Sequence, residues 1–111
     1  MEIKEGEYIR TKDGNIRKVS RVDQQQHYTY VYAENGFYHT PLNEIENHSF
    51  NIIDLIQEGD YVNGYKVINL DTGYVYVDNT KLGTNRLKTF TDYQIQSIVT
   101  KEQFSSLEYI I

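Results

Sequence analysis

The sequence predicts an all-β protein made of two similar halves with short helical turns. Tyrosine, which favours strands, accounts for 11 of the 111 residues, and there is a single proline. Asp-Gly and Asn-Gly dipeptides separate short runs of alternating polar and apolar residues, as expected for β-hairpins. A motif near the N-terminus also recurs in the middle of the chain.

The first half is expected to hold four strands. Asp13-Gly14 and Asn35-Gly36 form the turns of two hairpins, and residues 23–26 indicate a polar loop. Pro41 ends the last strand, because proline cannot donate to a ladder. The expected strands are residues 7–11, 16–22, 27–34 and 37–40.

The central stretch, residues 48–67, carries the densest aliphatic cluster of the chain. Residues 42–47 indicate a turn or a single helical turn, and Ser49 is a candidate N-cap for a short helix at residues 51–56. A buried strand fits the same segment, because so short an apolar cluster reveals no period. We expect a helical turn followed by a strand.

The second half is expected to continue the pattern of hairpins. Asn63-Gly64 and residues 71–73 form turns. Thr100 and Gln103 have the spacing of a capping box, which predicts a helix at residues 101–106. The expected strands are residues 59–62, 65–70, 74–78, 86–90, 95–100 and 107–111, with a loop at residues 79–85.

An internal repeat relates the two halves. Residues 3–9 and 56–62 are identical at four of seven positions and differ by Glu/Asp and Ile/Val exchanges at two more. Repeated motifs usually mean repeated substructures. Further matches, in the same order, pair Lys18-Val19 with Lys66-Val67 and Tyr28–Val31 with Tyr74–Val77.

Each half has the strand count of a small SH3-like barrel. We therefore expect an internal duplication with tandem SH3-like halves at residues 1–55 and 56–111, joined through residues 48–58. One compact domain with a shared core is the alternative. Such a core is expected to contain Ile52, Ile53, Leu55, Ile56 and Phe104.

Composition narrows the classes of function. The formal net charge is −5, which argues against nonspecific nucleic-acid binding, since that needs a cationic surface. Cysteine is absent, which excludes disulfides and thiolate metal sites. The sequence lacks the apolar run of a signal peptide and the roughly 20 apolar residues of a membrane span. We expect a cytoplasmic protein that does not contact a membrane.

Neither catalytic nor metal-binding motifs are present. His27, His39 and His48 have no metal-ligand spacing, although the first two could meet across the Asn35-Gly36 hairpin if Tyr32 lies opposite His39. The tightest acidic group flanks a glycine turn, where polar residues are expected anyway. It consists of Asp54, Glu58 and Asp60. We expect no enzyme, no metal and no cofactor.

Two candidate binding surfaces remain. If Val31 and Ala33 face the core, the alternating tyrosines of both halves face outward, and exposed aromatic patches often bind proteins. Packing of these rings across strands is the alternative. The tyrosines are Tyr28, Tyr30, Tyr32, Tyr74 and Tyr76. The second candidate is a nucleic-acid surface on the first hairpin, formed by Arg17, Lys18 and Arg21 near Arg10 and Lys12.

Three segments resemble small uncharacterised proteins encoded by phages and prophages of Gram-positive bacteria. They are His48–Ile56, Gly59–Val67 and Ile98–Phe104. The resemblance covers about the last two-thirds of the chain. It implies a mobile-element context and an SH3-like β fold, and it carries over no catalytic residue.

We therefore expect a non-enzymatic protein-interaction module of mobile-element origin that inhibits a host or defence protein. The acidic charge, the tyrosine stripes and the resemblance motivate this expectation. A nucleic-acid-binding regulator and a structural phage accessory component are the alternatives.

Overall fold

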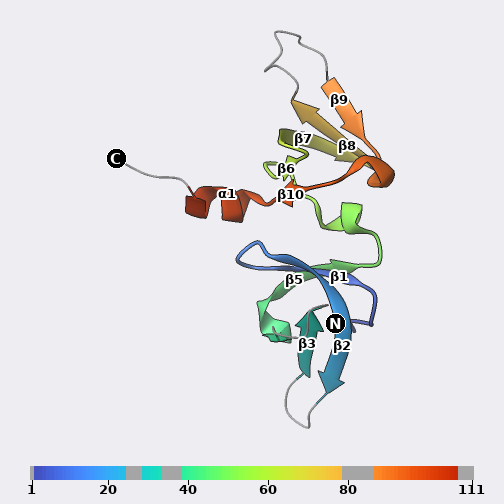
Figure 1. The fold of residues 1–111 in the computed structure, drawn as a ribbon, viewed down its shortest axis with the longest axis vertical. Coiled ribbons are helices and arrows are strands. Elements are labelled where there is room, and N and C mark those ends of the chain that lie inside the picture. The colour runs from blue at the N-terminus through green and yellow to red at the C-terminus, as the bar shows by residue number, and fades with distance from the viewer. Residues whose placement is uncertain (1, 25–28, 34–38, 79–86, 108–111) are drawn as a thin grey trace. The chain divides into compact units, whose positions relative to one another are not determined.

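The computed structural model describes residues 2–24, 29–33, 39–78 and 87–107. It divides the chain into two compact units, Met1–Leu55 and Ile56–Ile111, and each is described by itself below. Each unit contains one five-stranded antiparallel sheet (Figure 1). The prediction of a mainly β protein is confirmed, whereas the shared core stays a prediction.

The sheet of unit 1 has the strand order β4-β3-β2-β1-β5. Two 3-10 turns, η1 (Leu42–Glu44) and η2 (Ile52–Leu55), precede and follow its last strand. The strands are β1 (Tyr8–Thr11), β2 (Ile16–Gln24), β3 (Thr29–Ala33), β4 (His39–Pro41) and β5 (Ile45–Ser49).

The sheet of unit 2 has the order β9-β8-β7-β6-β10. In both sheets the described strands therefore follow the order fourth, third, second, first, fifth. A 3-10 turn, η4 (Asp92–Gln94), again lies before the last strand, and helix α1 (Lys101–Leu107) follows it. The strands are β6 (Tyr61–Val62), β7 (Tyr65–Asp71), β8 (Tyr74–Asp78), β9 (Leu87–Phe90) and β10 (Ile98–Val99).

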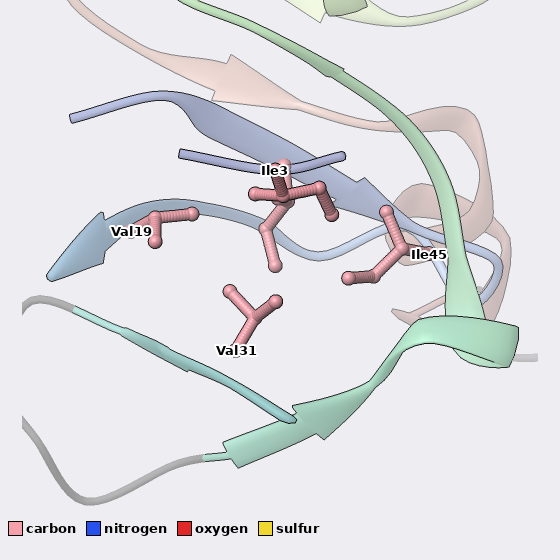
Figure 2. Packing of buried hydrophobic residues seen from close by; sticks show 5 residues of the cluster. Ile3, Val19, Val31 and Ile45 are labelled. Atoms are coloured by element: carbon pink, nitrogen blue, oxygen red, sulfur yellow. The ribbon is translucent and has the colours of Figure 1, made fainter. Parts of the chain in front are cut away.

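Each unit buries apolar residues from alternating strand positions and one isoleucine from the segment before its first strand. In unit 1, Ile3, Val19, Val31 and Ile45 point toward one another, and Ile9 completes the cluster (Figure 2). The buried apolar residues of unit 2 are Ile56, Val62, Val67, Val75, Val77 and Phe90. The strand alternation predicted at residues 27–34 and 74–78 thus places valine inside.

A β-bulge interrupts the alternation of buried and exposed residues along β2. The register with β3 shifts between Val19 and Arg21, so Ser20 is the extra residue. Its hydroxyl donates to the carbonyl oxygens of Tyr32 at 3.1 Å and Ala33 at 2.7 Å. Because of the bulge, Val19 and Val22 both reach the core.

Several sequence-based boundaries are wrong. The strand β2 extends to Gln24 and so replaces half of the predicted loop. The turn predicted at residues 42–47 is confirmed only at η1, because residues 45–49 pair with β1 as the strand β5. Of the strand predicted at residues 95–100, only β10 is formed, because residues 95–97 belong to the loop after η4. Leu107 ends α1 instead of starting a strand, and residues 79–86 and 108–111 lie outside the described part.

The predicted capping box is confirmed. The Thr100 amide donates to Gln103 Oε1 at 3.2 Å, and the Gln103 amide donates to Thr100 Oγ1 at 3.3 Å. Within the described ranges, the helices all fall short of the length and apolar content that crossing a membrane requires.

Candidate functional site

The tyrosines of β3 lie on the outer face of the unit 1 sheet. Val31 and Ala33 are buried, so their neighbours Tyr30 and Tyr32 point outward and are half-buried. Tyr28 lies outside the described residues. Between β2 and β3, two cross-strand pairs join a tyrosine to a charged residue: Asp23↔Tyr30 and Arg21↔Tyr32.

The outer face of unit 2 repeats this arrangement. Val75 and Val77 are fully buried, and Tyr76 is half-buried. Tyr74 has 48% of its surface exposed. Three pairs of cross-strand neighbours correspond between the units. Tyr61↔Lys66, Asp71↔Tyr74 and Asn69↔Tyr76 match Tyr8↔Lys18, Asp23↔Tyr30 and Arg21↔Tyr32.

The strand register corrects one part of the predicted repeat. Val19 pairs with Ala33, and the equivalent Val67 pairs with Val77. Residues 30–33 are therefore the equivalent of residues 74–77, and the sequence match at residues 28–31 is displaced by two positions. Both registers also shift after the paired valine, which places Ile68 at the position of Ser20.

The two outer faces differ in the residue that lies opposite Tyr32 in unit 1 and opposite Tyr76 in unit 2. In unit 1 the Arg21 guanidinium carbon lies 4.1 Å from the centroid of the Tyr32 ring, a cation–π contact that covers part of the ring. In unit 2 the shorter, neutral Asn69 lies opposite Tyr76. The bulge residue Ile68 is also 40% exposed. The outer face of unit 2 is therefore the more apolar of the two.

The basic residues of the first hairpin do not share one face. Lys18 lies opposite Tyr8, with its ammonium 6.0 Å from the ring centroid, on the outer face that also carries Arg21. Arg17 lies opposite the buried Ile9 and so belongs to the inner face. Arg10 is fully buried, and its guanidinium donates to the Leu55 carbonyl at 2.9 Å.

The repeated glycine-acid-tyrosine motif positions a buried carboxylate in each unit. Glu7 is 6% exposed and accepts a hydrogen bond from the Lys4 amide at 2.7 Å. Asp60 is 0% exposed and accepts one from the Gln57 amide at 2.8 Å. The sequence showed the repeat of these acids but not their burial.

The main chain around the two acids is hydrogen-bonded alike. The Val19 amide donates to the Glu7 carbonyl at 2.8 Å, and the Val67 amide donates to the Asp60 carbonyl at 2.7 Å. The preceding glycine amides, Gly6 and Gly59, donate back to the same valines at 3.0 and 2.9 Å. The motif therefore joins the start of each first strand to its neighbour.

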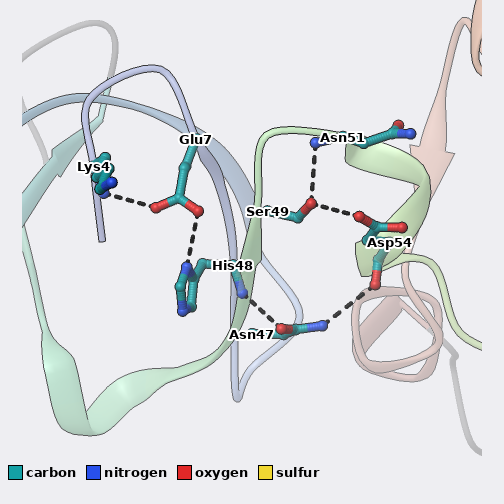
Figure 3. A network of polar contacts seen from close by, with 7 residues as sticks. All are labelled: Lys4, Glu7, Asn47, His48, Ser49, Asn51 and Asp54. Carbon is teal, nitrogen blue, oxygen red and sulfur yellow. Dashed lines mark hydrogen bonds and ion pairs between the residues drawn. The ribbon is translucent and has the colours of Figure 1, made fainter. Parts of the chain in front are cut away.

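The second partner of the carboxylate differs between the units. His48 Nδ1 donates to Glu7 Oε1 at 3.0 Å (Figure 3). Asp60 Oδ1 instead accepts from the Lys101 main-chain amide at 2.9 Å. Burial raises the pKa of Glu7, but the hydrogen bonds from Lys4 and His48 and the positive charges of both residues lower that pKa more, so it lies below its ordinary value.

The acidic group that the sequence singled out is divided among separate contacts. Asp54 Oδ2 accepts from the Ser49 hydroxyl at 2.6 Å, and that hydroxyl accepts from the Asn51 amide at 3.0 Å (Figure 3). The predicted N-cap is therefore wrong by two positions: Asn51 Oδ1 accepts from the Ile53 amide at 3.2 Å and caps η2, while Ser49 holds the residue before the turn. Asp60 belongs to the buried site of unit 2, and Glu58 is exposed.

Of the three histidines, only His48 has a side chain within the described part of the structure. The predicted pairing of Tyr32 with His39 is confirmed by the β3–β4 register. The meeting of His39 with His27 falls outside the described residues, because position 27 and the His39 side chain are not among them.

The sequence interpretation missed the turn η4 and its exposed aromatic ring. Tyr93 has 94% of its surface exposed. Thr91 and Gln94 close the turn, with the Thr91 amide donating to Gln94 Oε1 at 2.9 Å and the Gln94 amide to the Thr91 carbonyl at 3.0 Å. Their spacing is that of a capping box, which could have identified this turn from the sequence.

No family model, no curated protein and no solved structure matches this chain.

Proposed function

We propose that this chain is a non-enzymatic protein-interaction module that binds its partner through the outer tyrosine face of unit 2. One observation carries the proposal: Tyr74 is 48% exposed on a strand whose next residue, Val75, is fully buried. Tyrosine offers a large, stiff contact surface at low entropic cost, so such rings commonly anchor interfaces. Tyr76 lies on the same face, and the exposed Ile68 precedes Asn69, which lies opposite Tyr76.

The tyrosines of unit 1 are weaker candidates. Arg21 covers part of the Tyr32 ring, and a partner would have to displace this guanidinium before it reaches the ring. Asn69 presents no such cation at the equivalent position beside Tyr76. We therefore assign partner binding to unit 2 and a supporting role to unit 1.

The proposal includes the architecture of the units, two SH3-like barrels that arose by duplication. Three matches support it. The strand order is the same, a bulge follows the same valine, and the buried carboxylate has the same main-chain surroundings. A 3-10 turn also precedes the fifth strand in both units.

The biological setting belongs to the same proposal. The resemblance to phage and prophage proteins favours a mobile-element origin, and an acidic accessory protein can inhibit a cytoplasmic host or defence protein by occupying a cationic surface. The formal net charge of −5 supports such a partner.

Equivalent double variants in the two units test the proposal. The full chain is immobilised, incubated with a lysate of Gram-positive bacteria, and the retained protein is identified and titrated. We expect Tyr74→Ser with Tyr76→Ser to abolish retention, whereas Tyr30→Ser with Tyr32→Ser retains the partner. Absence of any retained protein, or the reverse ranking of the two variants, would contradict the proposal.

A nucleic-acid regulator is the second candidate, because Lys18 and Arg21 share an outer face with Tyr8 and Tyr32. Cations beside aromatic rings suit the stacking of bases near phosphates. This alternative predicts salt-dependent binding of single-stranded DNA that weakens in Lys18→Gln and Arg21→Gln. Arg17→Gln, on the inner face, is its matched control.

A further inference from the structure

The ring of Tyr93 is presented to solvent by a turn that is itself tightly held. A tyrosine exposed to 94% leaves almost all of its apolar surface in water. The turn below it is closed by the Thr91 and Gln94 contacts, and the Tyr93 amide donates to Asp92 Oδ1 at 3.0 Å. Among the large apolar residues of the described ranges Tyr93 is the most exposed, since the next, Phe50, has 62% of its surface exposed.

Asn63 fixes this turn from the neighbouring hairpin. Its Nδ2 donates to the Gln94 carbonyl at 2.8 Å. Its Oδ1 accepts from the amides of Gln96 at 2.8 Å and Ser97 at 3.1 Å. The Asn63 amide also donates to the Ser97 carbonyl at 3.0 Å. Four hydrogen bonds from one residue therefore hold the loop that follows Tyr93.

Asn63 suits this role because its backbone has a φ of 52°. Asparagine tolerates the left-handed region better than most residues, and Gly64 continues the turn with a φ of 85°. The Asn-Gly dipeptide thus closes the β6–β7 hairpin and also turns its side chain toward the loop after η4.

The turn begins beside the proposed binding face. Val75 pairs with Phe90, so Thr91 comes next to Tyr74 where β9 leads into η4 near the start of β8 (Figure 1). Asp71 lies opposite Tyr74, and Asp92 precedes Tyr93. This end of the unit 2 sheet therefore carries two exposed tyrosines and two exposed carboxylates.

We infer that Tyr93 is a pre-organised anchor that inserts into a pocket on a protein partner with a cationic rim. The inference rests on the proposed function and deepens it by naming the anchor and the charge of the partner. A ring whose main chain is fixed before binding loses less conformational entropy on association than a ring on an unordered segment. Asp71 and Asp92 select lysine and arginine around the pocket and repel the phosphates of nucleic acids.

Site-specific photo-crosslinking tests the anchor. The full chain with benzoylphenylalanine in place of Tyr93 is irradiated in a lysate of Gram-positive bacteria, and the crosslinked peptides are sequenced. Asn43, which is exposed in the turn η1 of unit 1 and lies outside the proposed surface, carries the same group in a control. We expect position 93 alone to crosslink efficiently, to one protein and within a surface rich in lysine and arginine.

Titration of that purified protein with variants measures the contribution of the ring. We expect Tyr93→Ser to raise the dissociation constant roughly 10- to 100-fold, as substitutions of interface hot spots do. Asn63→Gly keeps the positive φ but removes the three side-chain hydrogen bonds. We expect it to weaken binding about 3- to 10-fold, because the ring must then be ordered on association. Circular dichroism of both variants checks that the sheet is retained.

The outcomes separate this inference from the proposed function. If Tyr93→Ser binds as tightly as the unmodified chain while the Tyr74/Tyr76 variant loses binding, the anchor is overturned and the proposed function stands. Crosslinks to nucleic acid or to an acidic protein surface overturn the inference as well. If the unmodified chain binds no protein, both fail.

Discussion

His48 Nδ1 lies 3.0 Å from Glu7 Oε1, although the two residues are 41 positions apart in the chain. The contact joins β5 to the segment before β1, and its carboxylate is almost completely buried. An ionised acid in such a place contributes to folding only while it stays ionised.

The first prediction concerns the pH dependence of stability. The pKa of Glu7 is lower in the folded chain than its ordinary value, about 4.3 in an unfolded chain. The resulting stability is therefore fully present above that unfolded value and is lost as the pH falls through the folded pKa. We expect Glu7→Gln to lower the unfolding free energy by about 1–3 kcal/mol at pH 7, and we expect this difference to shrink as the pH falls through the folded pKa.

Urea titrations followed by circular dichroism between pH 3 and pH 7 measure this difference. Glu5→Gln, an exposed neighbour, is the control and should leave the curve unchanged. A constant offset between Glu7→Gln and the unmodified chain at every pH would contradict the assignment.

The second prediction concerns the buried acid of unit 2. Asp60 accepts the amides of Gln57 and Lys101, so Asp60→Ala leaves both donors without this acceptor. We expect a loss of about 2–4 kcal/mol in unfolding free energy. Lys101→Ala should cost far less, because it keeps the main-chain amide. Hydrogen exchange of the two amides would show whether Asp60 protects them, and unchanged exchange in Asp60→Ala would argue that it does not.

The third prediction transfers a residue between equivalent positions. Asn69→Arg introduces opposite Tyr76 the guanidinium that Arg21 supplies opposite Tyr32. We expect the partner to bind about 3- to 10-fold more weakly, since a cation–π contact then competes for the ring. The reciprocal Arg21→Asn should leave this affinity unchanged. Equal weakening by both variants would remove the distinction between the two faces.

The fourth prediction concerns the hydrogen bonds of Asn63. Asn63→Asp keeps an oxygen acceptor for Gln96 and Ser97 but replaces the donor to the Gln94 carbonyl with a carboxylate oxygen. We expect an unfolding free energy lower by about 1–2 kcal/mol. Asn63→Gly separates the cost of the side chain from that of the backbone. If Asn63→Asp is as stable as the unmodified chain, the Gln94 contact contributes little.

Local patterns were sufficient to predict the strands with one buried face. At residues 74–78 the alternation of tyrosine and valine identifies both the strand and its inner side. No such alternation identifies β5, because Ile45 is its only fully buried residue. The polar residues 46–49 are held in the strand by pairing with β1. Such pairing depends on a distant segment, which no local period reveals.

The tertiary contacts of the candidate site were equally hidden. The repeat revealed that Glu7 and Asp60 correspond, but their partners at positions 48 and 101 belong to the other end of each unit. Arg17, Lys18 and Arg21 look like one basic cluster in sequence. The strand register and the bulge at Ser20 divide them between two faces.

The different partners of the two buried acids have a consequence for protein engineering. In unit 2 the carboxylate is held by main-chain amides, which any residue except proline supplies, so positions 57 and 101 can be redesigned without losing the contact. In unit 1 the second contact comes from the side chain of His48, so a change at position 48 removes it unless the new residue is also a donor. Unit 2 is therefore the better scaffold for a library of redesigned surfaces.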